Sequence, residues 1–119
     1  MNILVSGGLG FIGHEVVGLL KDHNVMSIDS MTNYDFIPQE QMTKLFELRE
    51  SEVVNKQIDI RNQSDVNDVF ESFKPDVVIH LASYPRQKVV LENPRIASEV
   101  MSTGLINLLE ASKKTVSKF

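Results

Sequence analysis

Four glycines crowd the segment 6–13, between a short apolar run at residues 1–6 and a helical pattern over residues 11–23. The pattern places apolar side chains at helical spacing, namely Ile12, Val16, Leu19 and Leu20. A second apolar run, Val25–Ile28, ends at Asp29. Strand, glycine turn, helix and strand thus follow one another within about thirty residues, and a helical connection of that length joins parallel strands. No other part of the sequence constrains the fold as strongly.

Two further strands and a helix between them are expected downstream. Val53–Ile60 predicts a third strand, and Ser64 is the expected N-cap of a helix that closes at Pro75. The apolar side of this helix consists of Val66, Val69, Phe70 and Phe73. The nearly continuous apolar run 76–82 is typical of a parallel strand covered on both faces, and we expect it beside the first strand.

Two more helical patterns complete the chain. Pro94 suits the first turn of a long helix that continues to about Lys113. Its expected apolar side consists of Ala97, Met101, Leu105 and Leu108. A modest helix is expected where Met42, Leu45 and Phe46 recur at helical spacing.

Strands that alternate with helices predict an α/β fold, and right-handed connections favour a Rossmann-type doubly wound parallel sheet of order 3-2-1-4. Val116–Phe119 resembles the opening of a fifth strand. A length of 119 residues suits one domain, so we expect residues 1–119 to form a single, truncated domain. An unfinished sheet leaves an open edge, which predicts self-association.

The composition excludes several classes of function. Hydrophobic residues make up 42% and charged residues 24%, a balance typical of a globular protein. No apolar run approaches the roughly 20 residues of a membrane span, and the start lacks a signal peptide, so we expect a cytoplasmic protein. Cysteine is absent and the three histidines lie far apart, which predicts no metal site. The net charge of −4 argues against a nucleic-acid partner.

The glycine turn and Asp29 together favour dinucleotide binding. Gly7 permits a tight turn, Gly10 lets the backbone approach a pyrophosphate, and Gly13 lets helix and strand pack closely. Amide hydrogens at the head of the helix would face the phosphates. Asp29 follows the turn by about twenty residues, the spacing at which an acid meets the adenosine ribose. No arginine occurs in the next ten residues, so NAD is favoured over NADP.

At these residues the sequence resembles the extended short-chain dehydrogenase/reductase family, the NAD-dependent epimerases and dehydratases of nucleotide sugars. Besides the glycine turn and Asp29, three segments carry the resemblance: Asp59-Ile60-Arg61, His80-Leu81-Ala82-Ser83, and Asn93-Pro94 with the helix segment 104–111. The resemblance implies that Asp59 and Ile60 meet the adenine and that the second segment lies along the cofactor. The implied cofactor-binding set is Gly7, Gly10, Phe11, Ile12, Gly13, Asp29, Ser30, Asp59, Ile60, Leu81, Ala82 and Ser83.

Each of these assignments has a simpler alternative. The glycines could only build turns and Asp29 could only end a strand, while Asp59 could belong to a solvated strand end. His80 is interpreted as a packed, hydrogen-bonded core residue. Ser83 could touch the cofactor or merely turn the chain, and Arg86 is either a solvated cation or a ligand of a phosphate.

The resemblance does not extend to the catalytic residues. The family uses a tyrosine, a lysine four residues later on a fifth helix, and a serine or threonine after the fifth strand, all beyond this chain, so no residue here is assigned a catalytic role. The literal Tyr-x-x-x-Lys of Tyr84–Lys88 is rejected because Pro85 places it in a loop. Met101 stands where many relatives carry asparagine, and the sequence does not say what this changes.

The leading hypothesis is therefore the NAD-binding part of a nucleotide-sugar epimerase, dehydratase or reductase. Its partners would be a nucleotide-sugar substrate and, in a homo-oligomer, further copies of the chain. The alternative is a noncatalytic dinucleotide-binding module or an inactive relic of that family. A flavin protein is a more distant third, since a related glycine turn serves FAD.

Overall fold

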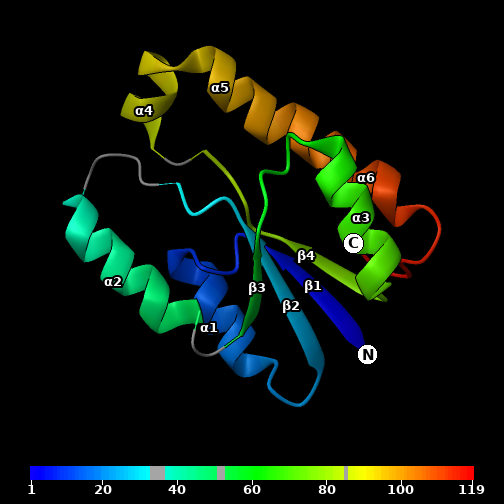
Figure 1. The fold of residues 1–119 in the computed structure, drawn as a ribbon. Coiled ribbons are helices and arrows are strands. Elements are labelled where there is room, and N and C mark those ends of the chain that lie inside the picture. Colours follow the sequence, from blue (N-terminus) through cyan, green and yellow to red (C-terminus); the bar gives the residue numbers. More distant parts are fainter. Residues whose placement is uncertain (33–36, 51–52, 85) are drawn as a thin grey trace.

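A computed structural model describes residues 1–32, 37–50, 53–84 and 86–119. It contains a four-stranded sheet made of β1 (Asn2–Ser6), β2 (Asn24–Asp29), β3 (Val54–Gln57) and β4 (Val77–His80). The strand order is β3-β2-β1-β4 and every neighbouring pair is parallel (Figure 1). The predicted fold class and strand order are therefore confirmed.

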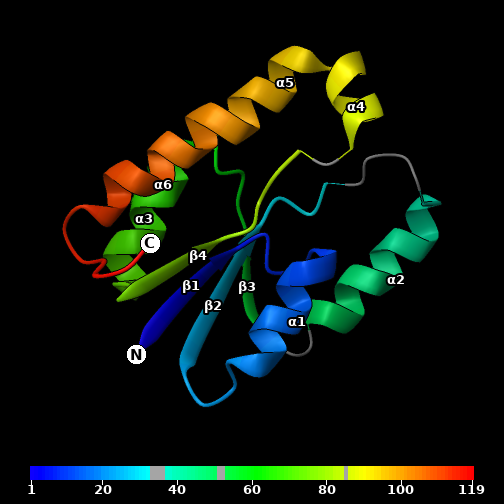
Figure 2. The same cartoon turned by 180° about the vertical axis from the view of Figure 1, so that it is seen from behind.

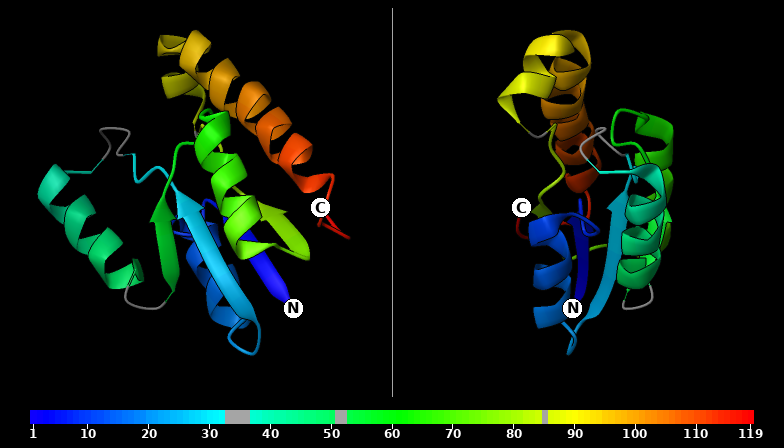
Figure 3. Two further views of the ribbon diagram at one scale, coloured as in Figure 1. Left: turned by 45° about the vertical axis from the view of Figure 1, so that its right-hand side comes forward. Right: turned by 90° about the vertical axis from the view of Figure 1, so that its left-hand side faces the viewer.

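Helices cover both faces of the sheet, as Figures 1 and 2 show from opposite sides. The helices around the sheet include α1 (Phe11–Leu19), α2 (Gln39–Glu50), α3 (Gln63–Phe73) and α6 (Gly104–Ser112). α1 packs on one face, and α3 and α6 pack on the other (Figure 3). α2 lies beyond β3, at that end of the sheet (Figure 1). This layering is the doubly wound arrangement that the alternating pattern predicts.

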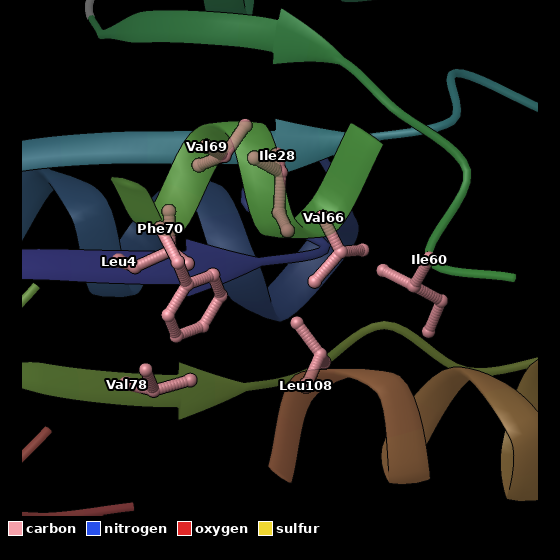
Figure 4. Close-up of a cluster of buried hydrophobic side chains, with 8 residues drawn as sticks. All are labelled: Leu4, Ile28, Ile60, Val66, Val69, Phe70, Val78 and Leu108. Atoms are coloured by element: carbon pink, nitrogen blue, oxygen red, sulfur yellow. The ribbon is translucent and has the colours of Figure 1, made fainter. Parts of the chain in front are cut away.

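Two apolar cores result from the alternation of side chains along β1. Ile3 and Val5 point to the α1 face and pack with Val17, whereas Leu4 points to the opposite face. Figure 4 shows the larger core, which consists of Leu4, Ile28, Ile60, Val66, Val69, Phe70, Val78 and Leu108. The predicted apolar side of α3 is thus confirmed, with Phe73 at its margin.

Two predicted helix boundaries are wrong. α1 ends at Leu19 rather than His23, and its Ile12 and Leu19 side chains are exposed, so Val17 is the residue that α1 contributes to the core. The N-cap of α3 is Asn62, not Ser64, because the Asn62 side chain accepts hydrogen bonds from the amides of Ser64 and Asp65.

The third strand is also shorter than predicted. β3 ends at Gln57, so residues 58–60 lead out of the sheet instead of continuing it. The amide of Ile58 still donates to the carbonyl of Asp29, at 2.9 Å. Asp59, Ile60 and Arg61 then form a turn before α3. Because this turn lies outside the sheet, its backbone is not extended as it would be in a strand.

The predicted long helix is interrupted by one wide turn. It consists of α5 (Pro94–Ser98), the π-helical turn η1 (Glu99–Thr103) and α6. Ala97 and Leu108 are buried as predicted, but Met101 lies inside η1 and is 50% exposed. Met101 is turned away from the predicted buried side because a π-turn inserts one extra residue into the helix. A further short helix, α4 (Gln87–Glu92), occupies part of the segment expected to be a loop.

The last residues pair with the sheet as the sequence predicts. Lys118 forms a parallel bridge with Val77, and the Val78 amide donates to the Lys118 carbonyl at 2.9 Å. This single bridge lies beside β4, where the sequence predicts a fifth strand. Among the residues that the structure describes, no helix is long and apolar enough to cross a membrane.

Candidate functional site

The carboxyl ends of all four strands lie at one edge of the sheet, because the strands are parallel (Figure 1). The glycine turn follows β1, Asp29 ends β2, the turn at residues 59–61 follows β3, and Leu81 and Ala82 follow β4. Ligands of open α/β sheets bind at this edge, next to the point where the strand order reverses. The structure thus brings four separate sequence motifs to one place.

Gly7 has a conformation and a position that no other residue would tolerate. Its φ of +76° lies in the left-handed region that favours glycine. A Cβ atom on Gly7 would lie 2.7 Å from the amide nitrogen of Ala82. The Gly7 amide also donates to the Ile28 carbonyl at 2.8 Å, so the turn touches the ends of both β2 and β4.

Gly13 and Gly10 differ in what their missing side chains would meet. A Cβ on Gly13 would overlap the carbonyl oxygen of Gly7, so the first turn of α1 packs directly on the glycine turn. A Cβ on Gly10 would meet only that same oxygen, at 3.2 Å, among the described residues. The fold itself therefore requires glycine at position 13 much more strictly than at position 10.

Among the residues that the structure describes, no hydrogen bond is found from the amides of Phe11, Ile12 and Gly13 at the head of α1. Its N-cap is Gly10, which provides no side-chain acceptor, and the first turn carries no acidic residue. The Phe11 and Ile12 side chains are 84% and 64% exposed, which keeps this end of the helix open. Free amides and the positive end of the helix dipole favour an anion here.

Asp29 lies against the glycine turn. Its Oδ2 accepts a hydrogen bond from the Leu9 amide at 3.1 Å, and its Oδ1 accepts one from the Met31 amide at 2.8 Å. Burial raises the pKa of the Asp29 carboxyl, while these two hydrogen bonds and the nearby Arg49 cation oppose the rise. The adjacent Ser30 hydroxyl is paired with Thr32, at 2.8 Å.

Arg49 also contacts the site, although the sequence alone does not predict it there. It lies in the last turn of α2, and its guanidinium donates from Nη1 to the Leu9 carbonyl, at 2.5 Å. The Leu9 amide meets Asp29, so Arg49 and Asp29 hold the two polar groups of one glycine-turn residue. Arg49 lies beyond the ten residues that follow Asp29 and reaches the glycine turn because α2 folds back toward it.

The turn after β3 contains a network of charges. The Arg61 guanidinium donates to both carboxylate oxygens of Asp59, at 2.6 to 3.0 Å, and from Nη1 to Glu99 of η1 at 3.3 Å. The hydrogen bonds from Arg61 lower the pKa of Asp59. The Asp59 carboxylate is therefore held in an ion pair by Arg61, with its side chain 38% exposed.

His80 and Ser6 form a hydrogen-bonded pair at the ends of β4 and β1. The distance between His80 Nδ1 and Ser6 Oγ is 2.6 Å, and burial lowers the pKa of the imidazole. His80 is thus a hydrogen-bonded, half-buried residue, as interpreted from the sequence. Ser83 and Arg86 are exposed beyond the strand, which leaves both of their alternatives open.

The rejection of the Tyr84–Lys88 pair agrees with the described geometry. Lys88 lies in α4, whereas Tyr84 precedes that helix, so the two side chains do not share one helical face. Pro85 lies outside the described residues. Within the described part of the chain, no group of three or more histidine, cysteine or acidic side chains is arranged to hold a metal ion.

A parallel sheet of order 3-2-1-4 with a glycine turn after β1 defines the Rossmann class of α/β proteins. The model of the GDP-mannose 4,6 dehydratase family matches residues 4–119, and the chain belongs to that family. The resemblance to nucleotide-sugar epimerases and dehydratases is thereby confirmed.

Individual proteins agree with this assignment. The chain is 30% identical to Protein CapI of Staphylococcus aureus, over 95% of this chain and 34% of that protein. It is 38% identical to UDP-glucuronate 4-epimerase of Thermodesulfobacterium geofontis, over 92% and 35%. The structure of UDP-glucose 4-epimerase from Thermus thermophilus in complex with NAD has a TM-score of 0.76 and 30% identity, over 97% and 34%. The chain spans about a third of the length of the curated relatives it matches.

Proposed function

We propose that residues 1–119 form one domain that binds NAD in a nucleotide-sugar epimerase or dehydratase. One observation carries the proposal: Asp29 is bonded to the Leu9 amide and so lies directly beside the open head of α1. A site for an anion and a carboxylate suited to sugar hydroxyls are thereby adjacent, as a dinucleotide requires. The NAD complex of a structural neighbour supports the choice of cofactor.

The diphosphate is assigned to the head of α1. The amides of Phe11, Ile12 and Gly13 would donate to its oxygens, and the absence of an acid in the first turn removes a competing charge. Gly10 would lie closest to the phosphates. A methyl group there would press on the Gly7 carbonyl oxygen at 3.2 Å, a milder contact than at Gly13, so the close approach of a ligand is a further reason for glycine at this position.

The remaining predicted residues are assigned along the same edge. Asp29 and Ser30 would bind the adenosine ribose, and Asp59 with Ile60 would bind the adenine. Leu81, Ala82 and Ser83 would border the nicotinamide half, next to Gly7. NAD is favoured over NADP because a 2′-phosphate would meet the Asp29 carboxylate, while the nearby Arg49 already donates to the Leu9 carbonyl.

The chemical role of these residues is to bind and orient the cofactor. NAD, when bound, supplies hydride transfer to or from a sugar carbon. The residues that would move the hydroxyl proton are assigned to the part of the protein beyond this chain, as are most contacts with the nucleotide-sugar substrate. A homo-oligomer of the whole protein belongs to the same proposal.

Calorimetric titration of the full-length protein with NAD and with NADP tests the assignment. We expect NAD to bind at least about tenfold more tightly, because like charges close together cost more than about 1 kcal/mol. Gly10→Ala should abolish or strongly weaken NAD binding while the protein stays folded, because the tight contact of the added methyl group with the Gly7 carbonyl oxygen needs only a small shift. Gly18→Ala is the matched control, since Gly18 lies in α1 and its added methyl group would meet no atom within 4 Å in the described part of the chain outside its own helix; this variant should bind NAD normally.

Absence of NAD binding by the unchanged protein would overturn the proposal. Tighter binding of NADP than NAD would overturn the cofactor preference alone. A protein that binds NAD but does not convert any nucleotide sugar would favour the noncatalytic alternative.

A further inference from the structure

The long helix reaches across to the turn after β3 through a buried amide. Asn107 of α6 is only 6% exposed, and its Nδ2 donates to the carbonyl oxygens of Ile60 and Arg61, at 2.9 and 3.1 Å. Both amide hydrogens are thus bonded to two successive residues of one turn. A buried amide without such partners would be costly, so this contact fixes the turn relative to the helix.

The contact is transmitted to Asp59 through one peptide unit. In a trans peptide the C=O and N–H groups point in opposite directions. Asn107 holds the Ile60 carbonyl toward the helix, and the amide of the same peptide, that of Arg61, donates to Asp59 Oδ1 at 2.9 Å. Asn107 therefore helps to set the direction of the Asp59 carboxylate through the Arg61 amide, alongside the Arg61 guanidinium, although the Asn107 and Asp59 side chains do not touch.

Two further contacts join the same elements. A Cβ on Gly104 would lie 2.5 Å from Ile60 Cδ1, so α6 approaches Ile60 as closely as a glycine allows. Figure 4 shows Ile60 in the core beside Val66 and Leu108, which ties the turn to both helices. Glu99 accepts the hydrogen bond from Arg61 described above. Three positions along the long helix, Glu99, Gly104 and Asn107, thus contact the turn.

We propose that Asn107 is a positioning residue that makes the site selective for adenine, a purine with an amino group at C6. The inference rests on the proposed function, in which Asp59 and Ile60 meet the base. A carboxylate in a fixed direction accepts from the 6-amino group of adenine and repels the 6-oxo group of hypoxanthine. The loss of Asn107 releases the peptide whose amide binds Asp59 Oδ1 and leaves the carboxylate held by the Arg61 side chain alone, so its direction is less well fixed and the discrimination between the two bases falls.

The test compares NAD with nicotinamide hypoxanthine dinucleotide in the full-length protein, by calorimetric titration. Asn107→Leu keeps the same branching and number of heavy atoms, with a somewhat larger volume, and removes both donors. We expect the ratio of the two affinities to fall about tenfold, the loss of one good hydrogen bond. Ser112→Ala is the matched control: Ser112 is equally buried in α6, but its hydroxyl donates within the helix, to Leu108. Its ratio should stay within about twofold of the unchanged protein.

A second variant changes the position of the turn through Ile60 instead of through the Asn107 hydrogen bonds. Gly104→Ala favours the helix and displaces Ile60, so it should lower the same ratio while the protein stays folded. This variant decides the question if Asn107→Leu does not fold. A ratio unchanged in the folded variants would overturn the inference and leave the proposed function intact. Failure of the unchanged protein to bind NAD would overturn both.

Discussion

Gly13 and Gly18 lie on the same helix but face different surroundings. A methyl group on Gly13 would overlap the Gly7 carbonyl, whereas a methyl group on Gly18 would meet no atom within 4 Å among the described residues, apart from the backbone of its own helix. We expect Gly13→Ala to lower the free energy of unfolding by about 1–3 kcal/mol or more, the cost of overpacking. Gly18→Ala should raise it by up to about 1 kcal/mol, because alanine is the better helix former. Urea unfolding measures both changes, and equal effects would contradict the packing described here.

His80 gives the stability of the fold a dependence on pH. Burial lowers the pKa of its imidazole from 6.5, so between that value and the lowered pKa the unfolded chain binds a proton that the folded chain does not. Stability should therefore fall as the pH drops below 6.5. The slope should stay below about 1.4 kcal/mol per pH unit, the value for one whole proton, because the half-buried ring is partly solvated.

The comparison of His80→Asn with the unchanged protein isolates this contribution. Asparagine does not titrate but can still bond Ser6, so the slope of unfolding free energy against pH should be smaller in the variant. Chemical unfolding at several pH values provides the measurement. The same slope in both proteins would show that other groups cause it.

At the scale of elements, α2 is expected to influence ligand binding through Arg49. Arg49→Gln removes the cation that opposes the rise in the pKa of Asp29, so Asp29 should protonate at a higher pH. A protonated Asp29 is a poorer acceptor for ribose hydroxyls, and NAD affinity should fall about tenfold, most strongly in mild acid. Titrations at two pH values measure this loss.

Lys44→Gln is the matched control for that prediction. Lys44 lies in the same helix and pairs only with Glu40, one turn away on the exposed surface, among the contacts that the structure describes. Its loss should leave NAD binding unchanged. If both variants weaken binding equally, the effect comes from the charge of α2 and not from the contact with Leu9.

How much of the site the sequence predicts depends on how local each contact is. Asp29 was found because the length of a strand-helix-strand unit fixes where its second strand ends. Arg49 and Asn107 reach the site from 40 and 47 residues away, and no local spacing reports such contacts. Asn107 did leave a signal, as a polar residue between apolar neighbours, but the pattern does not say what it bonds. The N-cap was misplaced because Asn62 and Ser64 are both good caps.

At the scale of the whole molecule, the outer side of the long helix predicts self-association. Its exposed apolar side chains are those of Ile96, Met101, Ile106 and Leu109. Apolar surface of this kind commonly covers an interface. The 119-residue chain should therefore associate reversibly as its concentration rises, as sedimentation velocity would show.

Two lysine substitutions locate that association. Ile106→Lys should shift the chain toward the monomer. Leu19→Lys, on an exposed part of α1, should not. A monomer at every concentration would contradict the prediction, and equal responses to the two substitutions would show that the contact is not specific to the long helix.

The wide turn η1 also limits how the length of the long helix can change. Deletion of one residue from an α-helix rotates everything beyond it by about 100° relative to the part before it. If a deletion closed η1 into an ordinary turn, α5 and α6 could not both keep their present orientations: either α5 would swing around the helix axis, or Asn107 would leave the two carbonyls that it binds. An insertion or deletion at this place is therefore not equivalent to one in a surface loop, and only changes close to whole turns preserve the geometry at both ends of the helix.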